Sequence, residues 1–100
     1  MLTILKKIFS FTNYQQLMRN GAVIIDVRTG QEYDSGHIAG AKNIPIERLG
    51  TRAQELKQMR VPIICCCATG IRSAAASRLL QSKGIEAYNG GSWSRLANKL

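Results

Sequence analysis

The stretch VPIICCCATGIRSAAASRLL, residues 61–80, carries the clearest signal for a fold, because it predicts a strand joined to a helix through a very short loop. Residues 61–67 form a nearly continuous apolar run, which is typical of a strand that is covered on both faces in a parallel sheet. Residues 73–83 have a helical composition, and Gly84 follows where a helix would end. In such sheets, ligands bind at the carboxyl ends of the strands. We therefore expect a functional site at Cys67, where the strand passes into the loop.

Strands and helices alternate along the rest of the chain. The apolar run of residues 22–26 predicts a second buried strand, and apolar residues at spacings of three and four after Ile46 predict a helix with one buried stripe. In chain order, the sequence first predicts a helix that begins with a capping box at Thr12 and Gln15 and ends at Gly21, then a strand over residues 22–26, and then a turn-rich loop over residues 29–40 with a helical turn at residues 31–34. Next come a helix from Ile46, a strand over residues 61–67 and a helix over residues 73–83. The last predicted elements are a strand over residues 85–88, a turn at Gly90 and Gly91, and a helix capped by Ser92.

The three longer helices each carry apolar residues that we expect to face the core. They are Leu49, Ala53, Leu56 and Met59 in the first, Ala75, Ala76, Leu79 and Leu80 in the second, and Trp93, Leu96, Ala97 and Leu100 in the last. The alternation of strands and helices predicts an α/β domain with a central, mainly parallel sheet flanked by helices on both faces. One hundred residues suffice for one domain, which we place at residues 12–100, after an N-terminal segment of unknown role at residues 1–11.

The chain is strongly basic, with 14 Lys and Arg against six Asp and Glu and a net charge of +8. This excess favours anionic partners. The basic residues are spread along the chain without a nucleic-acid-binding motif, so we expect a small anionic substrate or a solvated basic surface and no nucleic acid. No apolar run has the length of a membrane span and no signal-cleavage site is present, so we expect a cytoplasmic protein with reduced thiols and no membrane partner.

The residues that follow Cys67 are suited to stabilise a thiolate. The backbone N–H groups of residues 68–72 and of the first helical turn can converge on one point, and the helix dipole adds to their effect. Together with Arg72, these groups favour ionisation of the Cys67 thiol. The same groups would hold the charge of whatever the sulfur acquires.

Two long motifs resemble those of rhodanese-like domains. Residues 62–91, PIICCCATGIRSAAASRLLQSKGIEAYNGG, are similar to the active-site segment of that family, with Cys67 in the position of the catalytic cysteine. Residues 24–45, IIDVRTGQEYDSGHIAGAKNIP, resemble a second family signature. The matching positions are Gly70, Arg72 and Ser73 in the first motif and Asp26, Val27, Arg28, Glu32, Gly36, His37, Ile38, Gly40, Ala41, Asn43, Ile44 and Pro45 in the second.

The resemblance implies a sulfurtransferase. Cys67 would take the outer sulfur of a small anionic donor such as thiosulfate and hold it as a persulfide until cyanide or a thiol removes it. A sulfur-relay protein is a further candidate partner, and the reaction requires no metal or organic cofactor. The substrate-binding loop would consist of Ala68, Thr69, Gly70, Ile71, Arg72 and Ser73.

Three residues outside the loop receive supporting roles. We expect Asp26 and Arg28 to fix the loop after the first strand through an ion pair and hydrogen bonds, because charges at strand ends need partners. His37, the single histidine, is expected to pack and form hydrogen bonds rather than transfer protons. Arg72 is expected to bind an anion or shape the loop, and Trp93 to anchor the last helix.

Alternatives stay open at this point. Counted from Cys66, the spacing Cys-x5-Arg72-Ser73 also fits a cysteine-dependent phosphatase or an arsenate-reductase-type enzyme. A non-catalytic sulfur-carrier module would need the same loop. Cys65 and Cys66 are otherwise interpreted as small buried side chains, with a redox role left open. Three consecutive cysteines and one histidine cannot complete a zinc site, so we expect no metal.

Overall fold

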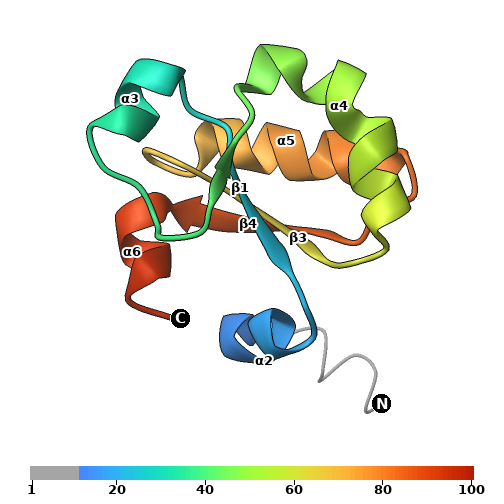
Figure 1. Cartoon of the computed structure of the whole chain (residues 1–100), viewed down its shortest axis with the longest axis horizontal. Helices are drawn as coiled ribbons and strands as arrows, with labels where there is room; N and C mark the ends of the chain where they lie inside the picture. Colours follow the sequence, from blue (N-terminus) through green and yellow to red (C-terminus); the bar gives the residue numbers. More distant parts are fainter. Residues whose placement is uncertain (1–11) are drawn as a thin grey trace.

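A four-stranded parallel sheet runs through the centre of the structure, a computed structural model that describes residues 12–100 (Figure 1). The strands lie in the order β2-β1-β3-β4. The elements are α2 (Tyr14–Arg19), β1 (Val23–Asp26), α3 (Gly30–Asp34), β2 (Lys42–Asn43), α4 (Ile46–Met59), β3 (Ile63–Cys67), α5 (Ile71–Ser82), β4 (Ala87–Ser92) and α6 (Trp93–Ala97). The predicted α/β class and parallel sheet are confirmed.

β3 is an inner strand, and all five of its residues are buried. It pairs with β1 on one side and β4 on the other, with Cys66 opposite Asp26 and Cys67 opposite Ser92. Because the strands are parallel, their carboxyl ends meet at one edge of the sheet. This register brings Asp26, Cys67 and the end of β4 to that edge.

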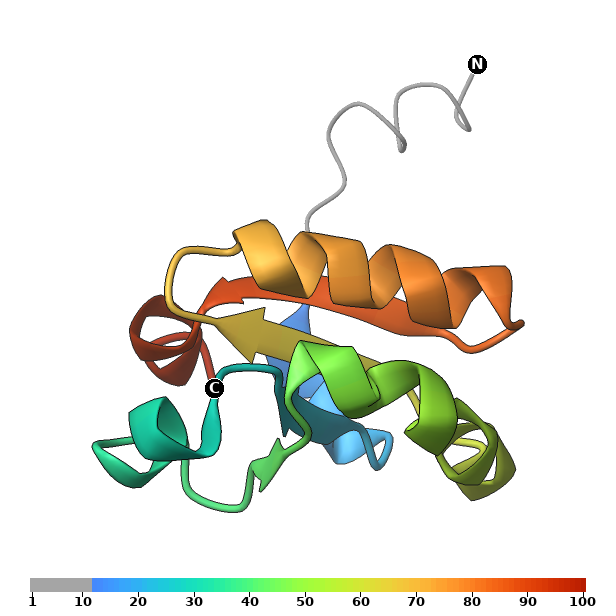
Figure 2. The ribbon, with the colours of Figure 1, turned by 90° about the horizontal axis from the view of Figure 1, so that it is seen from above.

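Helices cover both faces of the sheet, as the sequence predicts. α4 and α5 lie on one face, and α2 and α6 lie on the other (Figures 1 and 2). Side chains alternate between faces along a strand. Accordingly, Cys65 and Cys67 pack in the core beneath α4 and α5, whereas Cys66 packs on the opposite side near Leu96 of α6.

The bounds of several elements differ from the sequence-based prediction. The N-cap of α2 is Asn13 rather than Thr12, because the Asn13 side chain accepts the hydrogen bond from the Gln16 backbone N–H. The helix predicted over residues 73–83 begins two residues earlier, at Ile71. Here the loop is shorter than expected, so the first helical turn lies directly beside Cys67.

The turn predicted at Gly90 and Gly91 is wrong, because both residues belong to β4. The pairing with β3 shifts by one residue there, so that Cys65 lies opposite Asn89 and Cys66 opposite Gly91. Gly90 is the residue of β4 that this shift leaves without a partner on β3, and it has to be glycine. A Cβ on Gly90 would lie 2.8 Å from Leu96 Cδ2 and 2.9 Å from Ile64 Cγ2.

The predicted inner faces are confirmed in part. Leu49, Ala53 and Leu56 of α4, Ala76 and Leu80 of α5, and Leu96 of α6 are buried, and Leu79 and Trp93 are half-buried. Four expected core residues are exposed instead: Met59, Ala75, Ala97 and Leu100. Three of these lie at or beyond the last turn of a helix, and Ala75 lies at the solvent edge of the α5 stripe.

Candidate active site at the carboxyl edge of the sheet

Cys67 ends the central strand, directly before the loop that leads into α5. Its side chain has no exposed surface. The loop turns sharply at Gly70, the N-cap of α5, whose φ of +101° lies in the left-handed region that favours glycine. A side chain at this position would also approach Gly91 Cα of β4 at 3.3 Å. Glycine therefore lets the loop close tightly over the sulfur.

The sulfur of Cys67 accepts hydrogen bonds from the loop. The backbone N–H of Gly70 lies 3.0 Å from Sγ and that of Ser73 lies 3.4 Å from it. The Ser73 hydroxyl is a third contact, at 3.4 Å. The predicted convergence of loop amides is thus present around this atom.

These contacts determine how readily Cys67 ionises. Burial raises the pKa of the Cys67 thiol, but hydrogen bonds from the Ser73 hydroxyl and from loop amides outweigh burial, and the pKa lies below that of an ordinary thiol. The position at the start of α5 acts in the same direction, because a helix N-terminus favours negative charge.

The two preceding cysteines have the opposite electrostatic environment. Burial raises the pKa of the Cys65 thiol to about 12, and burial followed by the nearby Asp26 raises the pKa of the Cys66 thiol to about 12. All three cysteines are free and buried. At neutral pH, Cys67 is therefore the thiol of this strand that ionises most readily.

Asn89 supports the loop from β4, and we did not single it out in the sequence. Its Oδ1 accepts hydrogen bonds from the Ser73 hydroxyl at 2.6 Å and from the Gly91 backbone N–H at 2.9 Å. Its Nδ2 donates to the Gly70 carbonyl at 3.3 Å. A hydroxyl has one proton, so while Ser73 donates to Asn89 its oxygen can accept from the Cys67 thiol, and it donates to the sulfur only when that proton turns from Asn89 toward the thiolate. The signal that could have identified Asn89 was a polar residue directly after the strand predicted over residues 85–88.

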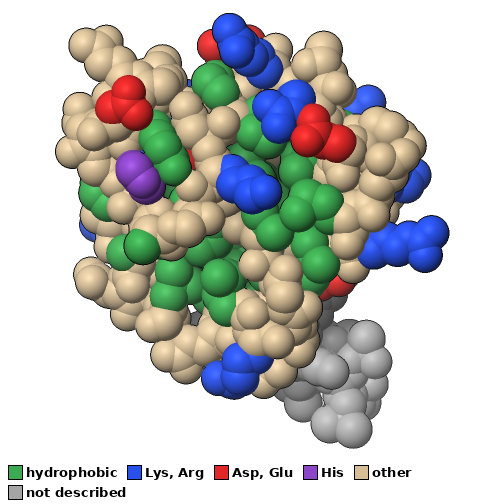
Figure 3. Space-filling model, viewed as in Figure 1, with side chains coloured by type: hydrophobic (Ala, Val, Ile, Leu, Met, Phe, Trp, Pro, Cys, Tyr) green, Lys and Arg blue, Asp and Glu red, His purple; other side chains and the backbone are tan. Residues whose placement is uncertain are grey.

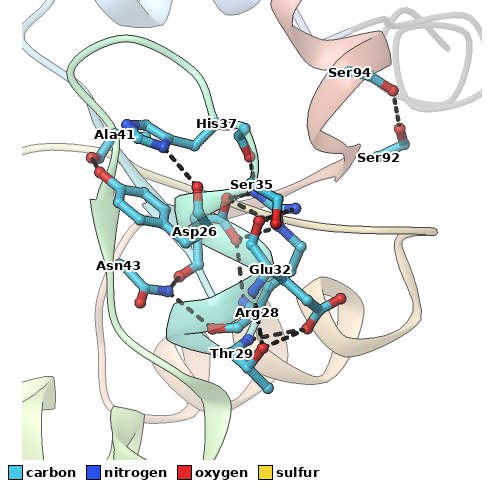
Figure 4. A network of polar contacts seen from close by, with 12 residues as sticks. Asp26, Arg28, Thr29, Glu32, Ser35, His37, Ala41, Asn43, Ser92 and Ser94 are labelled. Atoms are coloured by element: carbon cyan, nitrogen blue, oxygen red, sulfur yellow. Dashed lines mark hydrogen bonds and ion pairs between the residues drawn. The ribbon is translucent and has the colours of Figure 1, made fainter.

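Asp26 and Arg28 form the predicted ion pair, and both are buried. Arg28 Nε and Nη2 donate to the Asp26 carboxylate, with Nη2 at 2.7 Å from Oδ2. Arg28 also donates to the carbonyl oxygens of Glu32 and Gly36 (Figure 4). Its guanidinium lies 4.9 Å from the centre of the Trp93 ring. This pair fixes the segment after β1, and it also holds α3 in place.

Arg72 has a partner that the sequence did not predict. Its Nη1 and Nη2 donate to the two Glu32 carboxylate oxygens at 2.8 and 2.9 Å. Hydrogen bonding from Arg72, followed by that from the Thr29 backbone N–H, lowers the pKa of Glu32 to about 2. The guanidinium, which we expected to bind an anion or shape the loop, forms a bidentate ion pair with Glu32 of α3.

His37 lies in the segment after α3. Its ring stacks on Tyr33 with the centroids 3.7 Å apart, and its Nδ1 lies 2.8 Å from the Tyr33 carbonyl oxygen, which makes Nδ1 the donor (Figure 4). The predicted packing and hydrogen bonding of this residue are confirmed. Asn43 closes the same region by donating to the carbonyl oxygens of Asp26 and Arg28, each at 2.9 Å.

A family model for the rhodanese-like domain matches residues 10–95. The chain belongs to the rhodanese-like domain family. The four-stranded parallel sheet with helices agrees with that assignment, as does the solved structure of reduced Bacillus anthracis CoADR-RHD. That structure superposes with a TM-score of 0.72 and 32% identity, over 85% of this chain and 15% of the other.

Relatives of this rhodanese-like domain include proteins named putative sulfur carrier protein and thiosulfate sulfurtransferase. The chain is 39% identical to the Bacillus subtilis uncharacterized protein YqhL over 68% of its length, and 36% identical to the B. subtilis putative sulfur carrier protein YrkF over 63%. It is 35% identical to the thiosulfate sulfurtransferase GlpE of Pseudomonas fluorescens over 71%. The chain spans 54%, 34% and 64% of these relatives, respectively.

The geometry of the rhodanese-like loop does not favour a site centred on Cys66. Among residues 12–100, the loop amides with a sulfur contact donate to Cys67, and the Cys66 side chain packs on the other face of the sheet. A nucleophile at Cys66 would be separated from these donors by the strand itself.

One hollow of the rhodanese-like domain lies away from residues 67–73. It has a volume of about 480 Å³, lies at the opposite edge of the sheet and is lined by residues that include Lys57, Arg60 and Glu86. Lys and Arg side chains are distributed around the face shown in Figure 3 without forming a continuous stripe. Over residues 12–100, no three His, Cys, Asp or Glu side chains gather to hold a metal ion, and no helix has the length and apolarity of a membrane span.

Proposed function

We propose that this protein transfers sulfane sulfur through a persulfide on Cys67. The observation that carries the proposal is the set of hydrogen bonds from Gly70 and Ser73 to one sulfur atom, at the end of a strand whose other two thiols have strongly raised pKa values. A stabilised thiolate is the reactive form of cysteine. The relative named thiosulfate sulfurtransferase supports this chemistry.

In the first half-reaction, the Cys67 thiolate attacks the outer sulfur of the donor. A new S–S bond forms on Cys67, the S–S bond of the donor breaks, and its electron pair leaves with the rest of the donor, as sulfite in the case of thiosulfate. The negative charge on the terminal sulfur of the persulfide then lies where the amides of the loop can stabilise it. No proton has to move in this step.

In the second half-reaction, a thiophilic acceptor attacks the terminal sulfur of the persulfide. Cyanide yields thiocyanate, and a thiolate yields a new persulfide. The S–S bond to Cys67 breaks, and its electron pair returns to Cys67 as a thiolate. The lowered pKa of Cys67 makes its thiolate a better leaving group.

Access to the sulfur requires the loop to move. Cys67 has no exposed surface, whereas Ala68 and Thr69 of the loop are exposed. We infer that these two residues shift to admit the donor, while the Ser73 amide stays fixed in the first turn of α5. Asp26, Arg28 and His37 keep the surrounding segment in position and do not take part in the chemistry.

Steady-state kinetics with thiosulfate and cyanide test the enzyme function. The expected result is thiocyanate formation with ping-pong kinetics that disappears in Cys67→Ala. A sulfur-carrier module, which the relative named putative sulfur carrier protein also supports, would form the persulfide with a protein donor and turn over thiosulfate slowly. Hydrolysis of an aryl phosphate without any thiocyanate would contradict sulfur transfer altogether.

A further inference from the structure

The side-chain amide of Asn89, on β4 beside the cysteine loop, is held in one orientation. Its Oδ1 faces the Gly91 backbone N–H at 2.9 Å, a group that can only donate, and its Nδ2 faces the Gly70 carbonyl oxygen at 3.3 Å, a group that can only accept. These two backbone groups determine which end of the amide is the oxygen. The same oxygen lies 2.6 Å from the Ser73 hydroxyl and therefore accepts a hydrogen bond from it.

The Ser73 hydroxyl lies between two acceptors and has one proton. Its Oγ is 2.6 Å from Asn89 Oδ1 and 3.4 Å from Cys67 Sγ. A neutral thiol can donate to Ser73 Oγ while the hydroxyl donates to Asn89, so the thiol is compatible with both contacts. A thiolate has no proton to donate, and Ser73 can stabilise it only by turning away from Asn89. The Asn89 amide and the Cys67 thiolate therefore compete for one hydrogen bond.

The charge on Cys67 Sγ changes twice in the proposed reaction, and the favoured acceptor of the Ser73 hydroxyl changes with it. In the first step a bond forms to Sγ, the S–S bond of the donor breaks and negative charge leaves Sγ, so the hydroxyl can return to Asn89. In the second step the S–S bond to Sγ breaks and its electron pair returns to that atom, so the hydroxyl can turn to the sulfur. Ser73 keeps its proton throughout, because only the acceptor of its hydrogen bond changes.

We propose that Asn89 is a positioning residue that accepts the Ser73 hydrogen bond while Cys67 is a thiol or a persulfide and releases it while Cys67 is a thiolate. The inference rests on the sulfur transfer proposed above and adds to it a residue outside the cysteine loop. A hydroxyl that stayed on the thiolate would stabilise the starting state more than the transition state of attack. Asn89 offers that hydroxyl another acceptor as charge leaves the sulfur, so it assists the first half-reaction more than the second.

The charged and titratable groups around the sulfur do not depend on this hydrogen bond. They are Arg72 of α5, which is paired with Glu32 of α3, the buried Asp26–Arg28 pair after β1, and the thiols of Cys65 and Cys66 in β3. β4 contributes no Asp, Glu, Lys or Arg side chain. Asn89 itself is exposed, so its replacement by an uncharged residue should leave these groups and the fold in place.

The pH dependence of Cys67 alkylation by iodoacetamide tests the competition without requiring sulfur transfer. Asn89→Leu keeps the approximate size of the side chain and removes its acceptor and its donor. The Ser73 hydroxyl then has no competing acceptor and stays on the thiolate, so the midpoint of Cys67 alkylation should move to lower pH. A residue that only held the loop closed would give the opposite shift, because weaker loop donors would raise the pKa of the thiol.

The two half-reactions should respond differently to Asn89→Leu. Both are measured at a pH above the alkylation midpoints of the variant and of the natural protein. Persulfide formation from thiosulfate in a single turnover should slow about fivefold, the size expected for one hydrogen bond. Transfer of sulfur from the preformed persulfide to cyanide should not slow. Intact-mass spectrometry follows the first rate, and thiocyanate formation follows the second.

Three further variants serve as controls. In a Ser73→Ala background, Asn89→Leu should change neither the alkylation midpoint nor the first rate, because the two residues act through one hydroxyl proton. Asn89→Val, which also lacks an acceptor and suits a strand, should reproduce the shifts of Asn89→Leu. Tyr88→Phe removes a neighbouring hydroxyl of β4, which donates to Glu86 at 2.6 Å, and should change nothing at Cys67.

The outcomes distinguish this inference from the proposed function. If the natural protein forms no persulfide on Cys67, sulfur transfer fails, and the alkylation midpoints still decide whether Asn89 competes for the hydroxyl. If folded Asn89→Leu and Asn89→Val leave the midpoint unchanged or raise it, or slow both half-reactions alike, the positioning role of Asn89 is wrong while sulfur transfer stands. Equal effects with and without the Ser73 hydroxyl would overturn it as well.

Discussion

Cys66 and Cys67 are adjacent in the chain and equally buried, yet their surroundings differ in almost every electrostatic respect. Cys67 faces the first turn of α5 and receives amide hydrogen bonds, whereas Cys66 faces the opposite side of the sheet, next to Asp26. The pKa of the first is lowered and that of the second is raised to about 12. The comparison shows that burial alone does not decide the reactivity of a thiol. The hydrogen-bond donors that converge on a thiol decide its reactivity.

The largest expected effect comes from removing the favoured sulfur. Cys67→Ala should lower the rate of sulfur transfer by about a thousandfold or more, because it deletes the nucleophile, and it should leave the far-ultraviolet circular dichroism spectrum unchanged. Cys66→Ala is the matched control and should keep most of the activity. If activity is lost in Cys66→Ala and kept in Cys67→Ala, Cys66 is the nucleophile and the roles assigned to the two cysteines are reversed.

The second-largest effect is expected in the pH dependence of alkylation, which should distinguish Cys67 from Cys65 and Cys66. Only the thiolate reacts with iodoacetamide. Because the pKa of Cys67 is lowered, its alkylation rate should rise through a midpoint below the usual value of about 8.5. Cys65 and Cys66 should remain protonated until far higher pH. Mass spectrometry of the alkylated peptides measures each rate. A Cys67 midpoint at or above the ordinary value would mean that burial outweighs the loop donors.

Removing one donor should have a smaller effect on the same profile. Ser73→Ala deletes the hydroxyl 3.4 Å from the sulfur, which should raise the pKa of Cys67 because one hydrogen bond to the thiolate is lost. The backbone N–H of residue 73 still donates. Ser77→Ala removes another buried hydroxyl of α5, which donates to the Ala74 carbonyl. This variant should leave the midpoint of Cys67 alkylation unchanged. Equal profiles for both variants would assign the lowered pKa to the amides alone.

The smallest effect is expected on stability from the two unreactive thiols. Cys65→Ala and Cys66→Ala should each lower the free energy of unfolding by about 1 kcal/mol, since each leaves a small void in a buried strand. Urea unfolding measures the loss, and Ile64→Val, which removes one methylene from the same strand, gives a reference of similar size. A loss several times larger would show that one of these thiols has a polar role that its contacts do not explain.

The sequence was sufficient to predict the parallel sheet and the position of Cys67 at the end of a strand, because a buried strand, a short loop and a helix follow one another in the chain. It was not sufficient for the partner of Arg72. Glu32 lies 40 residues away and reaches the loop only because Arg28 and the capping box orient α3. Likewise, two adjacent glycines predict a turn locally, whereas the close approach of Leu96 and Ile64 to Gly90 is a tertiary constraint. The interactions that were missed are those between segments far apart in the chain.

The most direct test of the account uses a protein with a single cysteine. The double variant Cys65→Ala, Cys66→Ala retains only Cys67. After treatment with excess thiosulfate and rapid desalting, intact-mass spectrometry should show the gain of one sulfur atom, which cyanide removes, and peptide mapping should place it on Cys67. The triple variant that also carries Cys67→Ala should gain nothing. A folded double variant that acquires no sulfur, while the natural protein does, would show that the persulfide forms on Cys65 or Cys66 and would contradict the central claim.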